Sequence, residues 1–111
     1  MAVRYARANA RHHRLAVEVV AQAVESWVAQ LPAGLDRVVV DPPRAGLGAG
    51  VRKALLEKLP ARITYVSCHP ATLARDLRDL RARYQFESLA LFDLFPQSGH
   101  MEAVAQLVRE A

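Results

Sequence analysis

Only one cysteine occurs in the 111 residues of the chain, and a single thiol cannot form an internal disulfide. No apolar run approaches the roughly 18 residues that a membrane-spanning helix needs, so we expect no membrane segment. The N-terminal residues contain no apolar segment of the signal-peptide type either. These absences predict a soluble, cytoplasmic protein. The length fits one domain, residues 1–111, and leaves no room for a second.

Acidic residues are absent from the first fourteen positions, which carry four arginines: Arg4, Arg7, Arg11 and Arg14. The net charge of +4 arises there, because basic and acidic residues balance each other from Leu15 onward. Spacings of three and four residues place the arginines on one face of a helix. Such a stripe suits contact with phosphates, although a helix face exposed to water explains four charges more simply.

The hydrophobic pattern alternates between helices and strands. Helical spacing predicts helices over residues 3–14, 21–31 and 50–59, and from Pro70 onward. Apolar runs rich in β-branched residues predict strands over residues 15–20, 36–43 and 62–68. This alternation indicates an α/β fold whose mostly parallel sheet is covered on both faces.

The C-terminal region predicts a hairpin. Residues 84–95 form a long apolar run, and its core candidates are Phe86, Leu89, Leu91 and Phe92. Residues 101–110 alternate with period two, but their alanine and glutamate favour a helix. We favour a strand for 101–110, paired with 84–95 across the polar loop P-Q-S-G-H.

Cys68 lies where the strand over 62–68 ends and a helix begins. A helix N-terminus stabilises a thiolate, which can act as a covalent nucleophile. Simple packing is the competing interpretation, because free cysteine is among the most buried residue types. The side chain of His69 would point the opposite way on an extended strand, so we expect no cysteine–histidine dyad. The four histidines show no metal-ligand spacing with this cysteine, and we predict no metal site.

Two carboxylates are further candidates. Asp41 ends a strand just before two prolines; it can accept hydrogen bonds from a ligand, or it can simply form a turn. Ligands of α/β sheets bind beyond the carboxyl ends of the strands, where both Asp41 and Cys68 are expected. Glu102 follows a polar loop and can act as a general base, although a lone glutamate there is more often a surface residue. The glycines of residues 46–50 do not match G-x-G-x-x-G, and a flexible turn into a helix explains them.

Three segments, taken in order, resemble one family: D-P-P-R-A-G-L, Y-V-S-C-H-P-A-T-L-A-R-D-L and F-D-L-F-P-Q-S-G-H-M-E-A-V-A-Q-L. They are similar to the C-terminal catalytic part of the RNA uracil-5-methyltransferases. These are class I enzymes that use S-adenosylmethionine to form 5-methyluridine in tRNA or rRNA. The segment Y-A-R-A-N-A-R-H-H also resembles the helix that leads into the family's third strand. Three motifs in order are far more specific than any one of them.

The resemblance implies a role for each candidate residue. Cys68 would be the nucleophile, because its addition to C6 of uracil makes C5 able to attack the cofactor's methyl group. Glu102 would be the base that removes the C5 proton, and Asp41 would lie at the cofactor site. The implied partner is tRNA or rRNA, whose target base must be flipped or unstacked. This also makes phosphate contact by the arginines more plausible.

The chain departs from the family's pattern at two positions. His69 stands where the family has asparagine, which we expect to affect base recognition more than thiol activation. Gln22 stands where an acidic residue that contacts adenine is expected. The resemblance further implies a truncated, Rossmann-like class I sheet, mostly parallel with a C-terminal antiparallel hairpin. It would lack the first two strands, and with them half of the cofactor site.

That truncation would leave a hydrophobic edge on the strand over 36–43 and predicts a homodimer or a complementing chain. Two functions then follow. In the first, the protein methylates C5 of uridine through a covalent Cys68 adduct once a partner completes the cofactor site. In the second, it is a non-catalytic methyltransferase fragment that self-associates or binds RNA. The sequence leaves open whether the chain alone is an enzyme.

Overall fold

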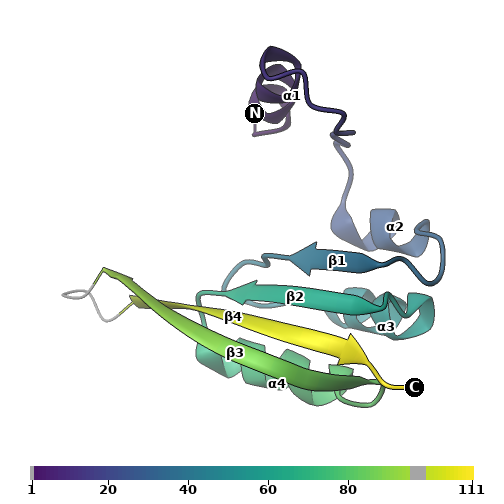
Figure 1. Cartoon of the computed structure of the whole chain (residues 1–111), viewed down its shortest axis with the longest axis vertical. Helices are drawn as coiled ribbons and strands as arrows, with labels where there is room; N and C mark the ends of the chain where they lie inside the picture. The colour runs from purple at the N-terminus through teal and green to yellow at the C-terminus, as the bar shows by residue number, and fades with distance from the viewer. Residues whose placement is uncertain (1, 96–99) are drawn as a thin grey trace.

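A computed structural model describes residues 2–95 and 100–111. The described residues form helices and strands in the order α1 (Ala2–His12), α2 (Val24–Ala29), β1 (Arg37–Val40), α3 (Ala49–Lys58), β2 (Arg62–Ser67), α4 (Pro70–Leu80), β3 (Tyr84–Phe95) and β4 (His100–Arg109) (Figure 1). Residues 96–99 of the expected loop P-Q-S-G-H lie outside the described residues, and its last residue, His100, begins β4. The α/β fold and the C-terminal hairpin are confirmed.

The four strands form one sheet in the order β1-β2-β4-β3. β1 and β2 are parallel, whereas β4 is antiparallel to both β2 and β3. The prediction of a mostly parallel sheet is therefore wrong, and the sheet is mixed. The reason is topological: the last strand inserts between β2 and β3, and both of its pairings run antiparallel.

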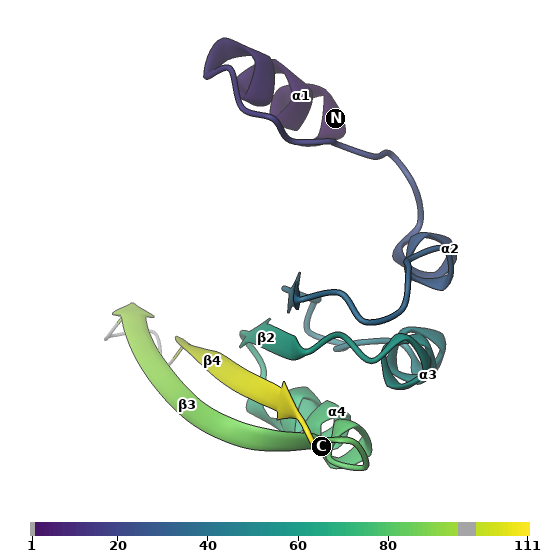
Figure 2. The same ribbon diagram turned by 45° about the vertical axis from the view of Figure 1, so that its right-hand side comes forward.

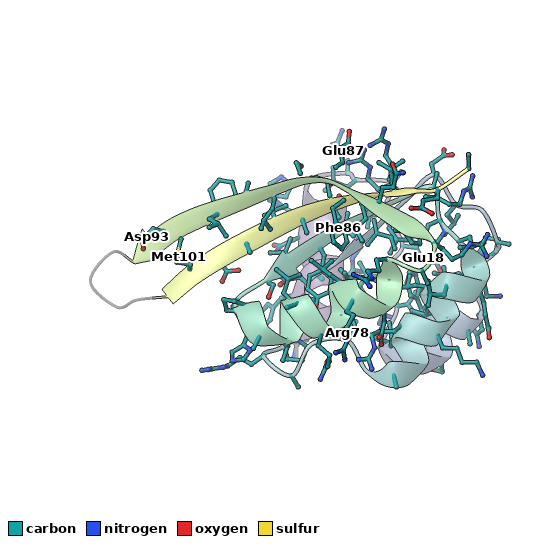
Figure 3. All side chains as sticks on the ribbon, turned by 90° about the horizontal axis from the view of Figure 1, so that it is seen from below. Glu18, Arg78, Phe86, Glu87, Asp93 and Met101 are labelled. Atoms are coloured by element: carbon teal, nitrogen blue, oxygen red, sulfur yellow. The ribbon has the colours of Figure 1, made fainter. Side chains whose placement is uncertain are left out.

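The core lies between the sheet and helices α3 and α4, which cover the same face (Figure 3). Alternate residues of β2 and β4 point into it: Ile63, Tyr65, Ala103, Ala105 and Leu107 are buried. The intervening residues of β2 are only partly buried. The expectation of helices on both faces is wrong for the described residues, because α3 and α4 share one face and α1 stands apart from the sheet (Figures 1 and 2). We call the uncovered side the open face.

The expected strand over residues 15–20 does not form. The segment has extended, irregular backbone, and Leu15 and Val17 are 57% and 60% exposed. A strand needs a hydrogen-bonding neighbour, and the sheet offers this segment none. Helix α1 likewise buries no residue. It ends at His12, so Arg14 lies beyond the arginine stripe, with a left-handed φ of 54°.

The core candidates of β3 were predicted wrongly. The helix-side residues Phe86, Leu89 and Leu91 are 54%, 59% and 59% exposed, and Phe92 is 48% exposed. β3 occupies the edge of the sheet because β4 lies between it and β2. Apolar content therefore identified the strand correctly but gave no information on its position in the sheet.

Other element boundaries follow local chemistry. β1 ends at Val40, before the two prolines, which cannot continue a strand ladder. α4 begins at Pro70, where a missing N–H costs nothing. The predicted helix over residues 21–31 is shorter and spans Val24–Ala29, and its N-cap, Ala23, has no side chain that could cap the first turn.

Candidate active site

The three candidate residues lie at the same end of the sheet (Figure 1). Asp41 follows the last residue of β1, and Cys68 follows the last residue of β2. β4 runs antiparallel to β2, and the pairing of Ser67 with Ala103 brings Glu102 level with Cys68. Cys68 and Asp41 are exposed and Glu102 is partly buried. The fold thus brings together residues that are far apart in sequence.

Strand alternation also assigns Glu102 to a face of the sheet. Val66 pairs with Val104, and residues two apart on a strand share a face. Glu102 therefore lies on the open face, with Val66 and Val104, and Cys68 follows directly after the last residue of the neighbouring strand β2.

The turn that carries Cys68 is fixed by its neighbours. The buried Ser67 accepts a hydrogen bond at Oγ from the backbone N–H of His69, at 3.0 Å. His69 is the N-cap of α4, where its Nδ1 accepts from the N–H of Thr72 at 3.3 Å. Asparagine is a good N-cap for the same reason, so the histidine retains a capping function. Its ring is engaged with α4 and forms no hydrogen bond with Cys68 among the described contacts.

The segment between β1 and α3, residues 41–48, is anchored by a buried carboxylate that sequence reasoning missed. Asp76 is 0% exposed and accepts hydrogen bonds from the N–H of Leu47 at 2.8 Å and from the hydroxyl of Tyr65. Arg52 forms an ion pair with it at 3.0 Å. Burial, followed by the hydrogen bond to Asp76, raises the pKa of Tyr65 above its ordinary value. The pattern could have revealed Asp76, because it shares the buried face of α4 with Leu73 and Leu80.

Gly46 allows this loop to approach α4. Its φ of +78° is in the left-handed region, which glycine adopts without steric cost. A Cβ at this position would lie 2.7 Å from Oδ2 of Asp76 and 2.8 Å from a guanidinium nitrogen of Arg75. Gly48 follows as the N-cap of α3. The expected role of these glycines, a turn into a helix, is confirmed.

An apolar cavity of about 330 Å³ lies between α2, β1 and the 41–48 loop. Its walls include Val40, Pro42 and Leu47, and two carboxylates line it, Asp41 from the loop and Glu25 from α2. Apolar walls next to carboxylates fit a ligand with a flat apolar part and a hydrogen-bond donor or positive charge. Gln22 takes no part in this lining; it donates to Ser26 Oγ at 3.1 Å.

In residues 2–95 and 100–111, no group of three or more histidine, cysteine or acidic side chains gathers in a way that could hold a metal ion. None of the helices in this part of the chain combines the length and the apolar character that crossing a membrane would require.

The sequence of the chain matches a known protein family. Residues 29–110 match the family model of the tRNA (uracil-5-)-methyltransferases. The chain belongs to this family. The matched range includes Asp41, Cys68 and Glu102, so all three candidate residues lie within the shared segment.

Individual members of the family are also similar to the chain. An uncharacterized RNA methyltransferase of Thermosynechococcus vestitus is 41% identical over 108 residues, which cover 95% of this chain and 24% of the relative. A 23S rRNA (uracil(1939)-C(5))-methyltransferase of Klebsiella pneumoniae is 42% identical over 99 residues, 88% of this chain and 21% of the relative. The chain thus spans about a quarter of the length of these curated relatives.

The chain is also similar in structure to a solved enzyme. The tRNA (uracil-54, C5)-methyltransferase of Pyrococcus abyssi, crystallised with S-adenosyl-L-homocysteine, superposes with a TM-score of 0.85 at 37% identity. The superposition covers 96% of this chain and 26% of the other. The mixed four-stranded sheet described above is therefore part of the fold of this family.

Proposed function

We propose that the protein provides the nucleophile and the base of an RNA uracil-5-methyltransferase that acts on tRNA or rRNA. One observation carries the proposal: an exposed Cys68 at the carboxyl end of β2 lies level with Glu102 on β4. Asp41 ends the neighbouring strand β1. These three residues stand in the segment that matches the family, and their roles are those that the family resemblance implies.

In the proposed reaction, Cys68 after β2 and Glu102 on β4 have separate roles. The thiolate of Cys68 adds to C6 of a flipped uridine, and the electron pair of the C5–C6 double bond moves into an enolate. Once C5 carries its new substituent, Glu102 takes the C5 proton. The C6–S bond then breaks, which restores the double bond and releases the thiolate. S-adenosylmethionine, the implied cofactor, supplies an electrophilic methyl group on a positively charged sulfonium when it is bound.

Asp41 and the residues that line the apolar cavity beside it fit the cofactor. A carboxylate suits a hydroxyl, an amine or a positive charge, and the valine and proline walls suit an apolar ring. We propose that a further polypeptide segment supplies the remaining contacts. Among the described residues no strand pairs with the outer edge of β1, which supports this, since the class I sheet that the resemblance implies has further strands there.

A cofactor-independent partial reaction tests the proposal. RNA labelled with tritium at C5 of uridine is incubated with the chain, and tritium in water is counted. Addition of Cys68 at C6 lets a solvent proton join C5; Glu102 then removes a hydrogen from C5, and the thiolate is eliminated. We expect release by the wild type, none by Cys68→Ala, and release slowed about 10²-fold or more by Glu102→Gln, in line with the usual contribution of a general base.

Glu87→Gln is the matched control, because Glu87 pairs with Arg62 near the opposite end of β2. Undiminished release by Cys68→Ala would overturn the proposal, and so would the absence of release from RNA that is demonstrably bound. Exposed arginines on α1 favour a second candidate function, RNA binding without chemistry. Binding that weakens steeply with salt, survives Cys68→Ala and is accompanied by no tritium release would identify it.

A further inference from the structure

Asp76 lies outside the proposed chemistry, yet it joins the parts of the site. It is fully buried on α4, the helix that begins two residues after Cys68. Its partners come from three other places in the chain: Leu47 in the 41–48 loop, Tyr65 on β2 and Arg52 on α3. Burying a charged group costs free energy because the group loses its hydration, and hydrogen bonds and opposite charges must compensate for this cost.

The first two turns of α4 hold the 41–48 loop at Arg44, Ala45 and Leu47. Thr72 Oγ1 donates to the carbonyl of Arg44 at 2.9 Å. Arg75 donates to the carbonyl of Ala45 at 2.7 Å, and it also pairs with Asp76. The loop's N–H of Leu47 completes the set by donating to Asp76. The loop that begins at Asp41 is therefore fastened to the helix that follows Cys68.

Asp76 orients the two arginines as well as binding the loop directly. The guanidinium of Arg52 bridges Asp76 and the carbonyl of Leu47, at 3.0 and 2.6 Å. Without the carboxylate, the positive charges of Arg52 and Arg75 would lie side by side at the loop carbonyls with less compensation. No buried side-chain nitrogen or oxygen lacks a partner among the described residues, so the network is closed.

We propose that Asp76 is a positioning residue, which fixes the loop carrying Asp41 against the helix that carries Cys68. In this role it sets the distance between the cofactor side and the nucleophile side of the site, and it touches neither substrate nor cofactor. The functional part of this inference rests on the proposed function. The structural part, that Asp76 controls the loop, stands without it.

The chain offers a matched control. Asp79 lies one turn further along α4 and also pairs with Arg52, at 2.7 Å, but none of its described hydrogen bonds reaches the 41–48 loop. Asp76→Asn and Asp79→Asn therefore both remove a negative charge next to Arg52, and only the first removes the carboxylate that accepts a hydrogen bond from the loop. Arg75→Met provides a second variant, because Arg75 is partly exposed and donates directly to the loop carbonyl of Ala45.

Amide hydrogen exchange of the full chain tests the positioning role. In Asp76→Asn we expect exchange at Leu47 and Gly46 to accelerate about tenfold or more, since a hydrogen bond to a charged group is lost. Amides of β2 and β4 should change far less, and Asp79→Asn should leave the loop near its wild-type rates. Arg75→Met should also accelerate loop exchange. Uniform acceleration across the sheet, or equal effects of the two Asp→Asn changes, would overturn the proposal.

Calorimetric binding of S-adenosyl-L-homocysteine supplies the functional readout. If Asp76 acts through the loop, Asp76→Asn should weaken binding in the wild-type background and add nothing in an Asp41→Ala background. Full additivity of the two losses would contradict a role through Asp41. A wild-type chain that binds none of the ligand would count against the proposed cofactor site, and the exchange data would still decide whether Asp76 controls the loop.

Discussion

Single residues of the 41–48 loop combine backbone geometry with close packing, and Gly46 is the clearest case. It needs a left-handed φ, and the space of its absent Cβ is taken by Asp76 and Arg75. Gly46→Ala should therefore destabilise the protein by about 2 kcal/mol or more, from backbone strain and the displacement of a buried ion pair. The free energy of unfolding, measured by urea denaturation, tests this.

Two other glycines distinguish the cost of backbone strain from the cost of displaced packing. Gly34 has a φ of +73° but nothing within 4 Å of its Cβ position, so Gly34→Ala should cost only the strain, about 1 kcal/mol. Gly50 lies inside α3 with open space, and Gly50→Ala should stabilise by roughly 0.5 to 1 kcal/mol. A loss for Gly46→Ala no larger than that for Gly34→Ala would contradict the packing explanation.

The position of a residue can be predicted from sequence where a motif occupies a strand end. Asp41 and Cys68 follow strands as the sequence indicates, and the structure places them at the same end of the sheet as Glu102. Their chemical roles stay predictions. Asp76 was missed because each of the two aspartates in R-D-L-R-D-L resembles a charge on a solvated helix. Helical spacing places it on the buried face of α4, but its function follows from Leu47 and Tyr65, which are distant in sequence.

At the scale of elements, local signals identified β1, β2, α3, α4 and the hairpin to within a few residues. Prolines and β-branched runs act locally, so they can be read from sequence. Sheet order cannot be read in this way. The antiparallel insertion of β4 and the exposure of Phe86 depend on which strands become neighbours. The same dependence left residues 15–20 without the strand that their valines predicted.

At the scale of the whole molecule, the main feature is the outer edge of β1, which carries an exposed apolar side chain. Within residues 2–95 and 100–111, β1 pairs with β2 alone, so its outer edge has no partner strand there, and Val39 on it is 63% exposed. A free, apolar strand edge favours pairing with another chain. We therefore predict that the purified chain self-associates at micromolar concentration through β1. Sedimentation velocity over a concentration series measures this, and a monomer throughout that range would contradict it.

Val39→Lys tests whether the chains associate through the β1 edge of the sheet. A lysine on an edge strand opposes pairing, so the dissociation constant of the dimer should rise about tenfold or more. Ala90→Lys places the same charge on β3, the strand at the opposite edge, and should leave association unchanged. Equal weakening by the two variants would indicate a general effect of charge, and the β1 interface would then be wrong.

The central claim is that Cys68 attacks C6 of uridine, and the most direct measurement is the mass of the covalent product. The chain is incubated with RNA that contains 5-fluorouridine, in the presence of S-adenosylmethionine, and is then denatured and digested. Fluorine at C5 blocks the proton removal that would release the enzyme, so the adduct should persist. We predict a nucleotide adduct on the peptide that contains Cys68, absent from Cys68→Ala. An adduct on another residue, or none on RNA that the chain binds, would contradict the account.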